Sequence, residues 1–83
     1  MTSPMTKDLA PIVAKNIKAA RADLGLTQRQ LADAVNGLDA LAVSRWERGV
    51  SLPSRDNFQA LAAVTGREVA WFYTEHTTES AAA

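Results

Sequence analysis

The sequence predicts an all-α protein, a compact bundle of five short helices. Apolar residues make up 47% of the 83 residues, and in the longer segments they recur at helical spacing. No segment alternates apolar and polar residues as a half-buried strand would. Capping side chains, glycine and asparagine separate the periodic segments. This length suits one small domain.

The first helix is expected over residues 8–24. Pro11 would then lie in the first turn, where its missing N–H is not needed. Gly25 is placed to end the helix in a left-handed cap. Lys15 and Lys18 lie off the apolar stripe and are expected to face solvent. The stripe that should be buried consists of Leu9, Ile12, Val13, Ile17, Ala20 and Leu24.

A pair of helices is expected over residues 27–35 and 40–48. The two helices are separated by Asn36-Gly37, since both residues tolerate a positive φ. Thr27 begins a capping-box pattern, and Asp39 is a favourable N-cap for the second helix of the pair. The residues expected to face the core from this pair are Leu31, Ala32, Val35, Val43 and Trp46.

Two more helices complete the bundle. Ser54 should cap a fourth helix that ends near Thr65. A short fifth helix over 68–73 carries three consecutive aromatic residues, which cannot all face one side because neighbours point about 100° apart. Phe72 should close the core, which leaves Trp71 or Tyr73 for a partner surface. The core residues expected from the fourth helix are Phe58, Leu61, Ala62 and Val64.

The ends of the chain lack this periodicity. We expect residues 1–7 to be a flexible leader, residues 8–73 to form the domain, and residues 74–83 to be a disordered tail. No apolar run approaches the roughly 20 residues that a membrane-spanning helix needs. We therefore expect a cytoplasmic protein with no membrane partner.

Charge and chemistry narrow the function classes. Nine basic and nine acidic residues give no net charge, which argues mildly against nucleic-acid binding. Glu75 and Glu79 fall in the expected tail, however, so the rest of the chain carries nine basic and seven acidic residues. There is no cysteine, and His76 is the single histidine. We expect no catalytic residues, no metal, no cofactor and no enzyme activity.

The predicted pair of helices has the layout of a helix-turn-helix, whose second helix lies in the major groove of DNA. The sequence resembles the lambda-repressor-like, or Cro/C1-type, helix-turn-helix family from Asn16 to Tyr73. The motifs that carry the resemblance are Ile17-Lys18-Ala19-Ala20-Arg21, Leu26-Thr27-Gln28, Leu31-Ala32, Ser44-Arg45-Trp46-Glu47-Arg48-Gly49, Pro53-Ser54 and Leu61-Ala62.

The resemblance implies a role for each matching residue. Arg45 is the main base-reading candidate, because its guanidinium can bind guanine O6 and N7 together. Leu41 and Ala40 would offer contacts to thymine methyl groups, and Ser44 would donate to a base or a phosphate. Arg21 and Glu47 would pair between the first and third helices. The residues implied or considered as phosphate contacts are Gln28, Arg29, Arg48, Ser51 and Arg55.

Two departures from the family pattern affect these roles. The turn before Asp39 is one residue longer than usual, and Ala40-Leu41-Ala42 is unusually apolar. The favoured function is a sequence-specific regulator of transcription at a double-stranded DNA operator, as in a phage-type Cro or repressor or a bacterial relative. A homodimer through Trp71 and Tyr73 would meet a palindromic site; the alternative is a monomer. The rival function is a protein-interaction module of the antitoxin or anti-repressor type.

Overall fold

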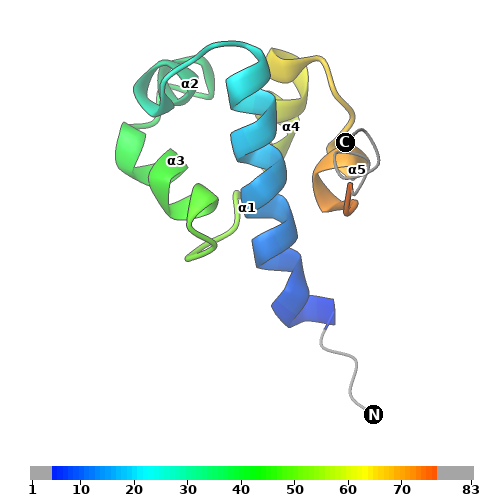
Figure 1. Ribbon diagram of the computed structural model, residues 1–83. Helices are drawn as coiled ribbons and strands as arrows, with labels where there is room; N and C mark the ends of the chain where they lie inside the picture. The colour runs from blue at the N-terminus through cyan, green and yellow to red at the C-terminus, as the bar shows by residue number, and fades with distance from the viewer. Residues whose placement is uncertain (1–4, 77–83) are drawn as a thin grey trace.

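Five helices follow one another in a computed structural model, which describes the backbone of residues 5–76 and the side chains of residues 9–76 (Figure 1). They are α1 Met5–Asp23, α2 Gln28–Ala34, α3 Ala40–Glu47, α4 Arg55–Thr65 and α5 Val69–Tyr73. No strand occurs within residues 5–76. The predicted all-α class is therefore confirmed.

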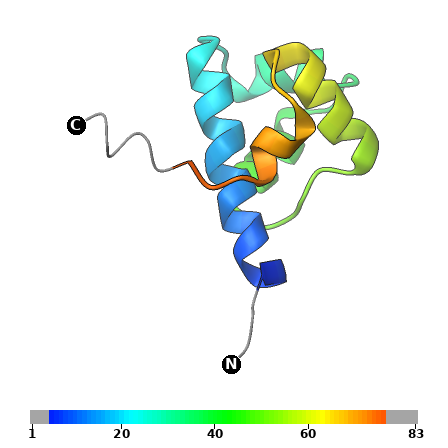
Figure 2. The same cartoon turned by 90° about the vertical axis from the view of Figure 1, so that its right-hand side faces the viewer.

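Helix α1 runs through the middle of the domain. Helices α2 and α3 lie on one side of it and α5 lies on the other (Figure 1), and the segment that follows α5 crosses in front of α1 when the molecule is turned by 90° (Figure 2). Side chains from all five helices meet in one core. Its buried members are Val13, Ile17, Ala20, Leu31, Ala32, Val35, Val43, Trp46, Phe58, Leu61 and Phe72.

Polar side chains fix where three of the helices begin. At α2 the backbone N–H of Gln30 donates to Thr27 Oγ1 at 3.0 Å, and the N–H of Thr27 donates to Gln30 Oε1 at 2.9 Å. Asp39 accepts from the N–H of Ala42 at the start of α3, at 3.2 Å. Ser54 accepts in the same way at the start of α4. Each cap satisfies an N–H that has no partner within its own helix.

The turn between α2 and α3 occupies residues 35–39. Asn36 has φ +54° and Gly37 has φ +66°, as the Asn-Gly pair predicts. The Asn36 amide also donates to Asn57 Oδ1 on α4, at 2.9 Å. This bond ties the turn to α4.

The ends of α1 differ from the prediction. The helix begins at Met5, within the expected leader, so Pro11 lies inside the helix rather than in its first turn and removes the hydrogen bond to the carbonyl of residue 7. It ends at Asp23, one residue early. Leu24 was expected in the core but is 45% exposed, because it lies in the turn that Gly25 closes with φ +70°. Residues 1–4 lie outside the described residues.

The expected tail also begins too early. Thr74 accepts a hydrogen bond through its backbone carbonyl from the side chain of Asn16 on α1, at 2.9 Å. His76 stacks on Trp71 with 4.4 Å between the ring centroids. Residues 74–76 therefore pack on the domain because α1 and α5 offer them partners. The remainder of the expected tail, 77–83, lies outside the described residues.

Candidate nucleic-acid interface

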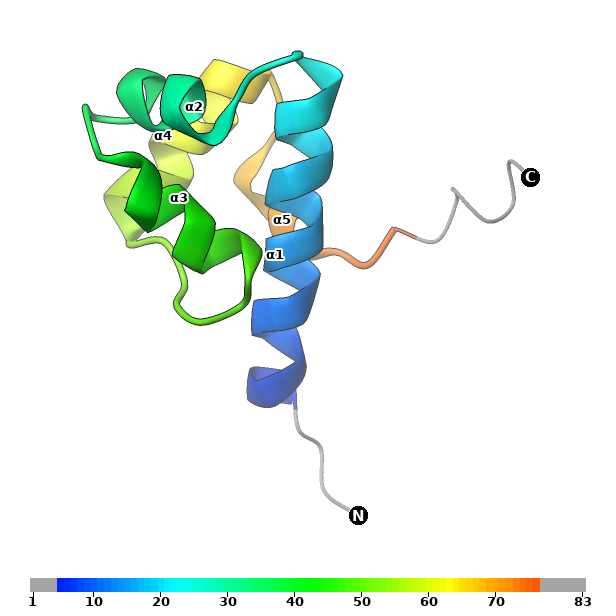
Figure 3. The ribbon, with the colours of Figure 1, turned by 60° about the vertical axis from the view of Figure 1, so that its left-hand side comes forward.

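Helix α3 presents one face to the core and the opposite face to solvent. Val43 and Trp46 are buried. The outer face carries side chains at positions i, i+3, i+4 and i+7, which share one side of a helix. These residues, the α3 stripe, are Leu41, Ser44, Arg45 and Arg48. Figure 3 shows α3 at the front of the domain, with α2 above it.

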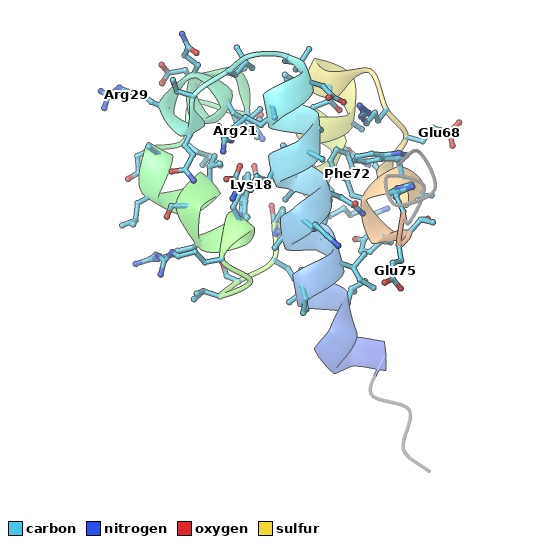
Figure 4. The ribbon with its side chains drawn as sticks, viewed as in Figure 1. Lys18, Arg21, Arg29, Glu68, Phe72 and Glu75 are labelled. Atoms are coloured by element: carbon cyan, nitrogen blue, oxygen red, sulfur yellow. The ribbon has the colours of Figure 1, made fainter. Side chains whose placement is uncertain are left out.

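The α3 stripe contains cations that no carboxylate of the described residues neutralises. Among the described side chains, salt bridges involve only Arg21 and Arg67. Arg45 and Arg48 are exposed, and the Nε of Arg48 donates to Ser44 Oγ at 3.3 Å. Arg29, on α2, points outward beyond this side of the domain (Figure 4). These guanidinium groups are available to an anionic partner.

A buried network joins α1, α2 and α3 behind the stripe. Arg21 donates to Glu47 through Nε at 2.6 Å and through a terminal nitrogen at 2.9 Å. Arg21 also donates to the carbonyl of Leu26 at 2.9 Å. Hydrogen bonding to Glu47 raises the pKa of the Arg21 guanidinium above its ordinary value, against the opposing effect of burial. The predicted pair between the first and third helices is confirmed.

Gln28 belongs to the same network. Its amide donates to Glu47 Oε1 at 3.0 Å. The first residue of α2 is therefore fastened to the last residue of α3. This bond fixes the angle between the two helices of the pair, and it holds one end of the Gln28 side chain against the protein.

The other predicted contact residues are spread over three elements. Ala40, at the start of α3, is partly exposed, and Leu41 is 51% exposed. Ser51 is exposed in the loop after α3. Arg55 is exposed but lines a different groove, beside Tyr73 and the start of α1. The structure thus brings the α3 stripe together and separates Arg55 from it.

Sequence reasoning assigned Lys18 only to the solvated face of α1. Its side chain lies between α1 and α3, close to the network (Figure 4). It lines a groove with Lys15 and Arg48. The spacing of basic residues at 15 and 18 was visible in the sequence, but the helix that would face them was not.

The two aromatic residues predicted for a partner surface differ in exposure. Trp71, on α5, is partly buried. The guanidinium carbon of Arg67 lies 4.2 Å from the centroid of the Trp71 ring, and the His76 ring stacks on the same indole. Tyr73 is 39% exposed, and its ring packs 4.9 Å from that of Phe58. Tyr73 therefore offers more free surface than Trp71.

Within the described residues, no three His, Asp or Glu side chains gather as metal ligands would. None of the helices in that range combines the length and apolar character that crossing a membrane requires.

Two helices joined by a tight turn, the second exposing a polar and cationic stripe, define a helix-turn-helix protein. The chain belongs to the helix-turn-helix family, whose model matches residues 17–72. It is similar in structure to a hypothetical transcription factor, NHTF, from Neisseria, with a TM-score of 0.78. The two share 25% sequence identity over 93% of this chain and 87% of that chain. No curated protein matches the sequence.

Proposed function

We propose that this protein is a DNA-binding regulator of transcription that reads double-stranded DNA by placing α3 in the major groove. The observation that carries the proposal is the α3 stripe, in which Arg45 and Arg48 have no carboxylate partner among the described residues. An α-helix fits the major groove, and its outer side chains reach base edges there. The similar Neisseria protein is described as a hypothetical transcription factor, which supports the same class.

The network behind the stripe supports this use of α3. Binding that depends on base edges requires side chains held on a rigid element. Arg21 and Gln28 fasten Glu47 at the end of α3, and Asp39 caps its start. The helix therefore presents its stripe in one orientation relative to α2.

We assign the base-reading roles within the stripe as follows. Arg45 binds a guanine through O6 and N7, and Leu41 packs on a thymine methyl group. Leu41 is 51% exposed, and its apolar neighbours Ala40 and Ala42 are partly exposed beside it. A protein partner would more commonly be met by a contiguous apolar patch. The exposed guanidinium groups of Arg45 and Arg48, rather than Leu41, therefore favour DNA over the rival protein-interaction module.

Phosphate contacts are assigned to the residues around the stripe. Arg48 and Ser51 lie at and after the C-terminal end of α3, and Gln28 and Arg29 lie at the start of α2. Asp39, by contrast, places a carboxylate at the start of α3. With no net charge on the chain, we expect weak non-specific binding, so that discrimination depends mainly on base contacts.

The regulator is proposed to bind its operator as a homodimer through Tyr73, with Trp71 at the edge of the contact. Tyr73 lines a groove with apolar side chains that include Leu9, Leu52 and Val69. Two copies related by a two-fold axis would place their α3 helices in successive major grooves, about 34 Å apart on one face of the duplex. Such a dimer reads a palindrome, as a phage-type Cro or repressor, or a bacterial relative, would do in the cytoplasm.

The test compares two arginines of the stripe on a site selected from random duplexes. Arg45→Ala should weaken binding by about 1–3 kcal/mol and remove the preference at one base pair. Arg48→Ala is the matched control, which should weaken selected and unrelated sequences by the same factor. Unchanged preference in Arg45→Ala would refute the assignment of the reading residue. A protein that enriches no DNA sequence would instead support the protein-interaction module.

A further inference from the structure

A groove of about 560 Å³ runs between α1 and the C-terminal end of α3. Its lining includes Pro11, Ala14, Lys15, Lys18, Glu47 and Arg48. Figure 4 shows the Lys18 side chain lying in the space between the two helices. The groove therefore combines an apolar floor with three cationic side chains.

The positive charge of the groove is not neutralised from within. Its one carboxylate, Glu47, already accepts from Arg21 and Gln28, and its side chain is only 4% exposed. No described carboxylate lies within 4.0 Å of the charged nitrogens of Lys18 or Arg48. Toward the described residues Arg48 donates through its Nε alone, to Ser44 Oγ, which leaves its two terminal nitrogens to donate to a ligand. Like charges gathered beside an apolar floor favour an anion between them.

We propose that this groove binds one phosphodiester of the DNA backbone, held by Lys18 and Arg48, with Lys15 at the rim. The proposal rests on the proposed function and adds α1 to the DNA-binding surface. Arg48 belongs to both the groove and the α3 stripe, so a duplex that holds the stripe in its major groove brings a strand past Lys18. The two side chains suit a phosphate in different ways: the lysine ammonium supplies a compact positive charge, and the arginine guanidinium supplies a planar set of hydrogen-bond donors.

The proposal predicts a change in salt dependence. The logarithm of the binding constant falls with the logarithm of salt by about 0.9 for each neutralised phosphate. Lys18→Gln should therefore reduce that slope by about 0.9 for each bound protomer, or about 1.8 for the proposed homodimer. Binding of the homodimer at about 0.1 M salt should weaken roughly sixtyfold, and the difference should vanish near 1 M. Every sequence should lose the same factor, because a phosphate carries no base identity.

Two further variants separate a local contact from a general loss of charge. Lys18→Arg keeps the charge in the groove and should retain the wild-type slope. Arg67→Gln removes one charge near α5, on the opposite side of α1 from α3, and should leave the slope unchanged (Figure 1). Lys18 is exposed, so circular dichroism should give Lys18→Gln the wild-type melting temperature.

Duplexes with one uncharged methylphosphonate each then locate the phosphate. At one position in each half-site the substitution should weaken binding by the wild type and leave binding by Lys18→Gln unaffected. A wild-type slope in Lys18→Gln, or equal losses in both proteins at every position, would overturn the proposal while leaving the proposed function intact. If the wild-type protein binds no duplex, both the phosphate-binding groove and the proposed function are refuted. Stronger competition by sodium phosphate than by sodium chloride of equal ionic strength, lost in Lys18→Gln, would assign the groove to free phosphate instead.

Discussion

Replacing Glu47 by alanine should destabilise the fold far more than replacing Asp23, although both carboxylates form ion pairs of the same length. The Arg21–Glu47 and Arg67–Asp23 pairs each have an N–O distance of 2.6 Å. The Glu47 side chain is 4% exposed, whereas that of Asp23 is 65% exposed. Burial is therefore the main difference between the two pairs, and it decides what the loss of each carboxylate costs.

The magnitude follows from what each substitution leaves behind. Glu47→Ala removes the acceptor of two bonds from Arg21 and one from Gln28. Breaking a buried pair on one side costs about 3–5 kcal/mol, and the lower end applies because Arg21 keeps its bond to the Leu26 carbonyl. Asp23→Ala should cost about 1 kcal/mol or less. A domain of this size has a total stability of roughly 4–12 kcal/mol, so Glu47→Ala removes a large part of it.

Urea unfolding followed by circular dichroism measures both losses. In thermal unfolding, a loss of about 3 kcal/mol should lower the melting temperature by roughly 12–24 °C. Glu47→Gln keeps one acceptor oxygen, so its free energy of unfolding should lie between those of wild type and Glu47→Ala. It replaces Glu47→Ala in the comparison if the alanine variant does not fold. Arg21→Ala and the double variant complete a cycle in which the losses should be less than additive. Equal losses for Glu47→Ala and Asp23→Ala would refute the reasoning.

Three other substitutions should change the stability of the fold in defined ways. Asn16→Ala removes the amide that donates to the carbonyls of Phe72 and Thr74, whereas the Trp71 carbonyl keeps the Thr74 N–H. Stability should therefore fall by about 1–3 kcal/mol and the α5 amides should exchange faster; unchanged exchange would contradict this role. Gly37→Ala meets no atom within 4 Å, so its cost should be the backbone strain alone, about 1–2 kcal/mol by urea unfolding, and a value near zero would be inconsistent with the observed φ. Arg21→Gln should reduce the free energy of unfolding by the same amount at about pH 6 and about pH 9. The raised pKa of Arg21 keeps the guanidinium charged at both pH values, and its contribution to stability disappears only above that pKa. A reduction that is smaller at about pH 9 would argue against the Arg21–Glu47 pair.

Helix boundaries in the middle of the chain could be predicted because caps act over a few residues. Thr27, Asp39 and Ser54 each bond to a backbone N–H three residues ahead, so the sequence around each position is sufficient. The inward direction of Val43 and Trp46 follows from helical spacing in the same way. These local rules also define the α3 stripe, which is the opposite face of the same helix.

Positions that depend on packing between helices could not be predicted. Asn16 is buried because α5 ends against it, 55 or more residues further along the chain. Lys18 is exposed, as expected, but nothing near it in the sequence indicates that it lines a groove with Arg48. Leu24 follows the apolar periodicity, but Gly25 ends the helix before Leu24 can turn inward.

Selection of bound sites from random duplex DNA at about 0.1 M salt tests the central claim most directly. We expect one motif to be enriched, with two symmetric half-sites and a guanine whose replacement costs wild type about 1–3 kcal/mol and Arg45→Ala nothing. Binding to that motif should weaken steeply as salt increases. If no sequence is enriched, or if binding does not depend on salt, α3 does not read DNA.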